Sequence, residues 1–183
     1  LAHVREASNR DALDASHEFN KPVTFRTQVP GQMRYGTGHV QIAGVEVRGA
    51  DGQPRRAFSF RDTVTIEAML TPHVDVEDLS VSFLVRDMTG VDLMGTTTFD
   101  EKVKLRARAG RPLRVRFSFP ASLRLGNYGV SLAVTRVSRR DYSDVVLFDQ
   151  VDGCAAFSVM PDPERPVHYK FHQDTSVEWE ETP

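Results

Sequence analysis

Apolar and polar residues alternate between Thr37 and Met160 with the period of two that half-buried β-strands produce. The alternation is clearest over residues 64–70 and 79–86, where every second side chain is apolar. Similar segments cover residues 40–47, 103–105, 113–119, 128–134, 145–151 and 155–159. No strong amphipathic helix interrupts them. The pattern therefore predicts eight or nine short strands.

Short strands separated by turn residues are typical of all-β domains. We predict an antiparallel two-sheet β-sandwich of the immunoglobulin-like or jelly-roll type over residues 35–160. The apolar parity switches at Ala43 and Gly44, which predicts a β-bulge there. Asp51 and Gly52 predict a turn.

Residues 87–91 form a predicted hairpin loop, with Gly90 in the left-handed position that a three-residue loop requires. The resulting register defines two faces. The pairs expected in the core are Val85 with Leu93, Phe83 with Gly95, and Val81 with Thr97. The pairs expected on the outer face are Arg86 with Asp92, Leu84 with Met94, Ser82 with Thr96, and Ser80 with Thr98.

Composition narrows the class of protein. The 183 residues are 40% hydrophobic and 26% charged, which suits one soluble core. A net charge of −2 disfavours a dedicated nucleic-acid binder, so we expect no nucleic-acid partner. The single cysteine, Cys154, cannot form an intrachain disulfide and favours a reducing compartment. No apolar run approaches the roughly 18–20 residues that span a bilayer.

The two ends differ from the central region. Residues 1–34 resemble a linker with a short helix over residues 4–15, and the start at Leu1 rather than Met leads us to expect a piece of a longer protein. The tail, residues 161–183, opens with three prolines. Val167, Tyr169 and Phe171 then alternate with polar residues, which predicts one more strand.

Several segments together resemble a known family. The order of the motifs carries the likeness: residues 34–38 (Arg-Tyr-Gly-Thr-Gly), 83–87 (Phe-Leu-Val-Arg-Asp), 93–98 (Leu-Met-Gly-Thr-Thr-Thr), 125–128 (Leu-Gly-Asn-Tyr) and 156–159 (Ala-Phe-Ser-Val). In this order and spacing, the chain resembles the C-terminal domain of Wzt, the ATPase subunit of ABC transporters that export O-antigen. The likeness covers roughly residues 34–160.

The resemblance implies a non-catalytic domain that binds O-polysaccharide, often at a modified non-reducing terminus, to select it for export. It implies a place on the cytoplasmic side of a Gram-negative inner membrane, beside the membrane subunit Wzm. It also implies a homodimer that exchanges C-terminal strands. Residues 1–34 would then link to an upstream ATPase domain. The chain has no Gly-x-x-x-x-Gly-Lys-Ser/Thr loop of its own, and no cofactor is expected.

The predicted outer face of the central hairpin mixes hydroxyls, charges and modest apolar surface, as sugar sites do. The candidate carbohydrate-binding residues are Ser82, Leu84, Arg86, Asp92, Met94, Thr96 and Thr98. Leu84 and Met94 would be two apolar side chains on a polar face. We therefore expect a sugar, a loop or another chain to cover them. The alternative function is a β-sandwich adaptor or dimerisation domain with no sugar ligand.

Three further groups have ordinary structural interpretations. The seven basic residues between Lys102 and Arg116 either attract an acidic ligand or form a solvated strand face, and we favour the second. Four aspartates, at positions 141, 144, 149 and 152, are either glycosidase carboxylates or caps of turns, and we favour caps. His168 and His172 would lie about 13 Å apart on a strand, too far for one metal ion.

Overall fold

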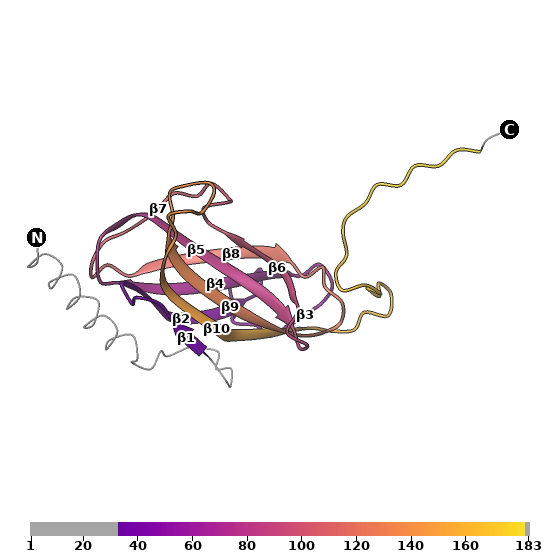
Figure 1. The fold of residues 1–183 in the computed structure, drawn as a ribbon. Coiled ribbons are helices and arrows are strands. Elements are labelled where there is room, and N and C mark those ends of the chain that lie inside the picture. The colour runs from indigo at the N-terminus through magenta and orange to yellow at the C-terminus, as the bar shows by residue number, and fades with distance from the viewer. Residues whose placement is uncertain (1–32, 182–183) are drawn as a thin grey trace, which may run out of the picture.

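The computed structural model describes residues 33–181, which form two β-sheets packed face to face (Figure 1). The expected linker helix lies outside the described residues. The strands are β1 (Met33–Tyr35), β2 (Val40–Arg48), β3 (Ala57–Phe58), β4 (Thr63–Pro72), β5 (Val76–Asp87), β6 (Asp92–Thr97), β7 (Leu105–Ala107), β8 (Leu113–Pro120), β9 (Gly126–Arg136) and β10 (Val146–Val159).

The larger sheet has the strand order β1-β10-β9-β5-β6, with β3 paired to β10 and β7 paired to β5. The smaller sheet has the order β2-β4-β8. All these pairs are antiparallel except the short β3–β10 pair. The prediction of an all-β, two-sheet sandwich is confirmed.

The core lies between the sheets and consists of the apolar residues that alternation selected. In β4 and β5, for example, Ile66, Val81 and Val85 have no exposed surface. The ring of Phe83 packs against Phe119 of the opposite sheet, with 5.3 Å between ring centroids. Full burial of one such side chain contributes roughly 1.5–3 kcal/mol, so these contacts hold the sheets together.

Two local predictions are confirmed. The pairing of β2 with β4 shifts between Ile42 and Gly44, which is the bulge expected from the parity switch. The turn after β2 contains Gly52 at a φ of 74°, and its N–H donates to the carbonyl of Gly49.

The central hairpin is partly as predicted. Its loop is correct, since the Asp87 N–H donates to the Val91 carbonyl and Gly90 has a φ of 83°. Arg86 pairs with Asp92 as expected. A bulge then follows, so that Val85 pairs with Met94 and not with Leu93.

This bulge makes the predicted register wrong for the rest of the hairpin. Phe83 pairs with Thr96, Leu84 with Gly95, and Ser82 with Thr97. A shift of one residue moves every side chain of a strand to its other face. Met94 and Thr96 therefore share the inner face with Val85 and Phe83, and they do not lie outside.

The tail contains less regular structure than predicted. In place of a strand over residues 167–171, Phe171 alone forms an antiparallel bridge, and it pairs with Leu123 of the same chain. The flanking backbone bonds run from Arg124 to Lys170 and from His172 to Ser122. The last part of the tail then runs away from the sandwich (Figure 1), and Trp179 is 81% exposed.

Candidate functional site

A polar cluster lies on the outer face of the larger sheet, and it begins at the central hairpin. Arg86 projects outward from β5 and donates through Nε to Oδ1 of Asp92 on β6, at 2.5 Å. Both residues occupy a directly paired position next to the hairpin loop. The pair is partly exposed, with the Arg86 side chain 37% and the Asp92 side chain 57% accessible.

Arg86 also extends across β9 toward β10. Its neighbour on β9 is Gly129, which has no side chain to block the path. A Cβ built on Gly129 would meet no atom within 4 Å, so the surface above it is open. Arg86 Nη1 consequently lies 4.0 Å from Oδ1 of Asp152. Adjacent strands are about 4.8 Å apart, so this contact spans two strand spacings.

A bulge in β10 puts Asp152 in reach of Arg86. The pairing of β10 with β9 is interrupted between Val151 and Ala155. Gly153 lies in this interruption at a φ of 60°, which glycine adopts without steric cost. Its N–H donates to the Ser131 hydroxyl at 3.2 Å, which holds the bulge against β9.

Two more side chains complete the cluster at the β1 edge. Gln150 donates from Nε2 to Oδ1 of Asp152 at 3.1 Å and to the Tyr35 hydroxyl at 2.5 Å. The Tyr35 hydroxyl donates in turn to Oδ2 of Asp152 at 3.3 Å. Tyr35 is 42% exposed, so its ring offers an apolar surface beside polar groups.

We call this cluster the Arg86 face. It comprises Arg86, Asp92, Asp152, Gln150 and Tyr35, which lie around Gly129 and Ser131. The two carboxylates favour the charged form of Arg86. The hydrogen bond to Asp92 raises the pKa of the Arg86 guanidinium against the effect of burial, and the charge of Asp152 raises it further. Burial and the nearby Asp152 raise the pKa of Tyr35.

A buried ion pair beneath the sheet holds the β1 edge in place. Asp149 has no exposed surface and accepts two hydrogen bonds from Arg34, at 2.9 and 2.7 Å. It accepts a third from the Ile42 N–H at 2.6 Å. Burial raises the pKa of Asp149, while the Ile42 N–H and the Arg34 charge oppose the rise. Because Arg34 precedes Tyr35, this pair positions the tyrosine of the Arg86 face.

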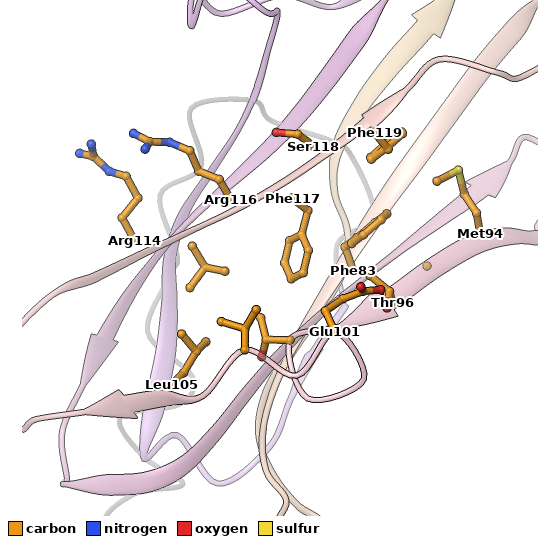
Figure 2. A pocket seen from close by; sticks show the side chains of 14 residues that line it. Phe83, Met94, Thr96, Glu101, Leu105, Arg114, Arg116, Phe117, Ser118 and Phe119 are labelled. Carbon is orange, nitrogen blue, oxygen red and sulfur yellow. Dashed lines mark hydrogen bonds between the residues drawn. The ribbon is translucent and has the colours of Figure 1, made fainter. Parts of the chain in front are cut away.

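A separate cleft opens between β6 and β8, the strands at the ends of the two sheets on that side. Its volume is about 630 Å³. Figure 2 shows the rings of Phe83, Phe117 and Phe119 gathered in it, with Thr96 and Glu101 on one side. The lining of the cleft is mainly apolar and includes several polar side chains, among them Thr96, Glu101 and Arg116.

The structure divides the predicted carbohydrate-binding residues between these two places. Four of them lie on β5 and at the start of β6, on the side of the Arg86 face: Ser82, Leu84, Arg86 and Asp92. The other three line the cleft: Met94, Thr96 and Thr98. Thr98 is buried, and its hydroxyl accepts the Val81 N–H at 3.0 Å. The bulge at Leu93 is the physical cause of this division.

Tyr35, Gln150 and Asp152 were not among the predicted site residues. They lie more than 50 residues from Arg86 in the sequence, and only sheet pairing brings them together. The one local signal was Asp152 followed by Gly153, an acid and a glycine inside an otherwise strand-like segment.

The other candidate groups have structural roles. Asp144 accepts from the Ser138 hydroxyl at 2.6 Å, and this bond lowers its pKa to about 2. Asp141 likewise accepts the Ser143 N–H, so both residues cap turns as expected. Asp149 is not a turn cap but a buried strand residue. Within residues 33–181, no group of three or more His, Cys, Asp or Glu side chains could hold a metal ion.

Several basic residues of the segment from Lys102 to Arg116 are paired with acidic side chains. Arg108 pairs with Glu77, at 2.6 Å. Arg116 donates to Glu67 at 2.6 Å, and Arg114 lies 3.8 Å from the same carboxylate. Burial alone would raise the pKa of Glu67, but the Arg116 hydrogen bond and the neighbouring charges lower it. These contacts favour the interpretation as a solvated strand face.

In the described part of the chain, no helix is long and apolar enough to cross a membrane. Residues 33–181 thus define an antiparallel β-sandwich with a hydrogen-bonding cluster on its larger sheet. The family model described as the Wzt C-terminal domain matches residues 31–172, and the chain belongs to that family. The family assigns it a role in the ABC transporter for O-antigen, in which the Wzt C-terminal domain is non-catalytic.

Solved structures agree with this assignment of the fold. The crystal structure of the C-terminal domain of Wzt superposes with a TM-score of 0.74 at 16% identity, over 82% of this chain and 89% of that chain. A β-glucuronidase of Bacteroides uniformis reaches a TM-score of 0.42 at 15% identity, over 67% and 14% of the two chains. The CARDB domain of the PF1109 protein from Pyrococcus furiosus reaches 0.37 at 14% identity, over 76% and 95%. The last two are too distant to carry an argument. No curated protein sequence matches the chain.

Proposed function

We propose that this domain binds O-polysaccharide on the Arg86 face and thereby selects the substrate of the transporter. The ligand is the non-reducing end of the polysaccharide, where a terminal sugar can lie flat against the sheet. The domain acts on the cytoplasmic side of a Gram-negative inner membrane, beside the membrane subunit Wzm, and performs no chemistry on the sugar.

The observation that carries this proposal is the chain of polar groups from Asp92 through Arg86 and Asp152 to Tyr35. Sugars present many hydroxyls, each of which donates one hydrogen bond and accepts others. Planar carboxylate, amide and guanidinium groups can donate to or accept from these hydroxyls. Hydrogen bonds that involve a charged group are stronger than those between neutral groups. The surface over Gly129 is open, which leaves room for a sugar to lie there beside these groups.

Calorimetry with O-polysaccharide from the source strain tests the location. Arg86→Ala removes the central donor, and hydrogen bonds to charged groups contribute about 1.5–3 kcal/mol, so we expect affinity to fall about tenfold or more. Arg55→Ala is the matched control, because Arg55 pairs with Asp51 in a distant turn. Circular dichroism confirms that each variant remains folded.

Thr96→Ala distinguishes the Arg86 face from the cleft. Thr96 lines the cleft and is not part of the Arg86 face. Loss of affinity in Arg86→Ala alone supports the proposal, whereas loss in Thr96→Ala alone moves the sugar into the cleft. If wild-type protein binds no polysaccharide, the adaptor function without a sugar ligand takes its place.

We also propose that two copies associate by exchanging tails. In the single chain, residues 170–172 bond to the backbone of residues 122–124. Lys170 adds an ion pair to Asp87 at 2.8 Å. The same bonds can form with a second copy, because the proline-rich stretch after Met160 favours an extended hinge that permits exchange.

Analytical ultracentrifugation tests the exchange. A chain that ends after Met160 loses every tail contact and is expected to sediment as a monomer, while the full chain sediments as a dimer. A dimer that persists without the tail would show that another surface holds the two copies together.

A further inference from the structure

The balance of charge on the Arg86 face limits the class of sugar that fits there. Two carboxylates, Asp92 and Asp152, flank a single guanidinium, so the group carries a net charge of −1. The nearby Asp87 is balanced by Lys170, and the buried Asp149 is balanced by Arg34. The basic group of the face is therefore already paired before any ligand arrives.

We infer that the Arg86 face selects an uncharged, hydroxyl-rich sugar and rejects an anionic one. This inference rests on the proposed function and adds the class of substrate to it. An anionic sugar that approached Arg86 would have to displace Asp92, or else lie between two carboxylates. At separations near 4 Å, repulsion of one unit charge weakens binding about fivefold in water and far more near a protein surface.

The acceptors of the face suit sugar hydroxyls. A carboxylate accepts several hydrogen bonds through its two oxygens. Gln150 donates to Oδ1 of Asp152 and Tyr35 donates to Oδ2, so each oxygen can accept a further hydrogen bond. Gln150 donates both its bonds through Nε2, so its carbonyl Oε1 has no hydrogen-bond donor within residues 33–181. Neutral hydroxyls can donate to these oxygens, whereas a sugar carboxylate or phosphate can only accept.

The floor of the face points to a flat ligand. Gly129 and Ser131 lie on β9, between β5 and β10. Ser131 is buried, and a Cβ built on Gly129 would meet no atom within 4 Å, so the open part of the floor lies over Gly129. The exposed ring of Tyr35 stands at one edge. A pyranose has an apolar face formed by its C–H groups, which fits against small side chains and an aromatic ring while its hydroxyls reach the surrounding acceptors.

Chemically matched probes test this inference. Calorimetry compares one O-polysaccharide preparation in two forms: with any carboxyl groups reduced to alcohols, and with primary hydroxyls oxidised to carboxylates. We expect the uncharged form to bind, and the oxidised form to bind at least tenfold more weakly at low salt. Affinity for the uncharged form should change little with salt, because no charge on the ligand is screened.

A charge-removal variant shows whether repulsion is the cause. Asp92→Asn with Asp152→Asn keeps the shapes and removes two negative charges, so the affinity ratio of oxidised to uncharged polysaccharide should rise at least tenfold. Asp75→Asn with Glu77→Gln removes the same charge about 30 Å along β5 and should leave that ratio unchanged.

The possible failures are distinguishable. If the oxidised form binds as well as the uncharged form or better, or if the aspartate variant leaves the ratio unchanged, the inference about charge is overturned while polysaccharide binding stands. If neither form binds the wild-type domain, the proposed function itself fails. If folding of the double variant is impaired, Asp92→Asn alone, at an exposed position, provides the same ratio test.

Discussion

Substitution of Gly129 by valine separates the stability of the sheet from the use of its outer face. A glycine within a strand is destabilising, by roughly 0.5–1 kcal/mol relative to alanine, because it has more freedom to lose on folding. Valine is in addition among the residues that strands favour. Its Cβ would meet no atom within 4 Å, so the side chain starts into open space.

We therefore expect Gly129→Val to raise the free energy of unfolding by about 0.5–1 kcal/mol. For a domain of this size, this corresponds to an increase in Tm of about 1–4 °C in differential scanning calorimetry. The same side chain would occupy the open surface over Gly129, beside Arg86. Affinity for O-polysaccharide should then fall at least tenfold, which is about 1.4 kcal/mol of binding free energy.

Thr71→Val is the control for this experiment. Thr71 lies on β4, in the other sheet, and its exchange for valine nearly preserves its shape. It should bind polysaccharide as the wild type does. A Gly129→Val protein that is more stable and yet binds with unchanged affinity would refute the reasoning, because the sugar would then not lie over Gly129. A loss of stability would show that the surface is not open.

Three other substitutions test the scaffold. Asp149→Ala removes the buried carboxylate of the pair with Arg34, so chemical denaturation should show a loss of about 3–5 kcal/mol in the free energy of unfolding. A loss below about 1 kcal/mol would contradict a structural role for the pair. Gly95→Ala would put a Cβ 2.4 Å from the Phe83 carbonyl oxygen, so we expect a lower Tm and a weakened hairpin, and an unchanged Tm would mean that β6 lies farther from β5. Ser138→Ala removes the main cause of the lowered pKa of Asp144, about 2 in the folded protein. A carboxyl whose pKa is lower in the folded state stabilises the folded protein above pH 3.8, and this contribution is lost as the pH falls through about 2. The variant should therefore show a higher pKa of Asp144 by NMR and a stability that depends less on pH between these values. An unchanged pKa of Asp144 would exclude this hydrogen bond.

The fold could be predicted from the sequence because alternation reports burial directly. Ile66 and Val81 belong to segments in which every second residue is apolar, and the structure buries both. The shorter segments were less reliable, since Val103 and Val145 are exposed. The bulge at Ala43 and Gly44 was visible because the parity of the apolar residues changes there. The bulge at Leu93 could not be predicted in this way, because Leu93 and Met94 are both apolar and either side chain could face inward.

The candidate site was only half predictable for the same reason. Arg86 and Asp92 are close in the sequence and joined by a short loop, so their pairing follows from turn chemistry. Asp152 and Tyr35 reach Arg86 through the order of strands in a sheet, and no local pattern specifies that order. The role of Gly129 depends on what lies on both sides of it, which alternation does not report.

The central claim is that polysaccharide lies on the Arg86 face, and NMR chemical-shift mapping tests it most directly. The ¹⁵N-labelled domain would be titrated with O-polysaccharide from the source strain. Binding as proposed predicts that the largest shifts fall on the amides of Arg86, Gly129 and Asp152, with small changes at Phe117 in the cleft. Large shifts confined to the cleft, or no shifts at a saturating concentration of polysaccharide, would contradict it.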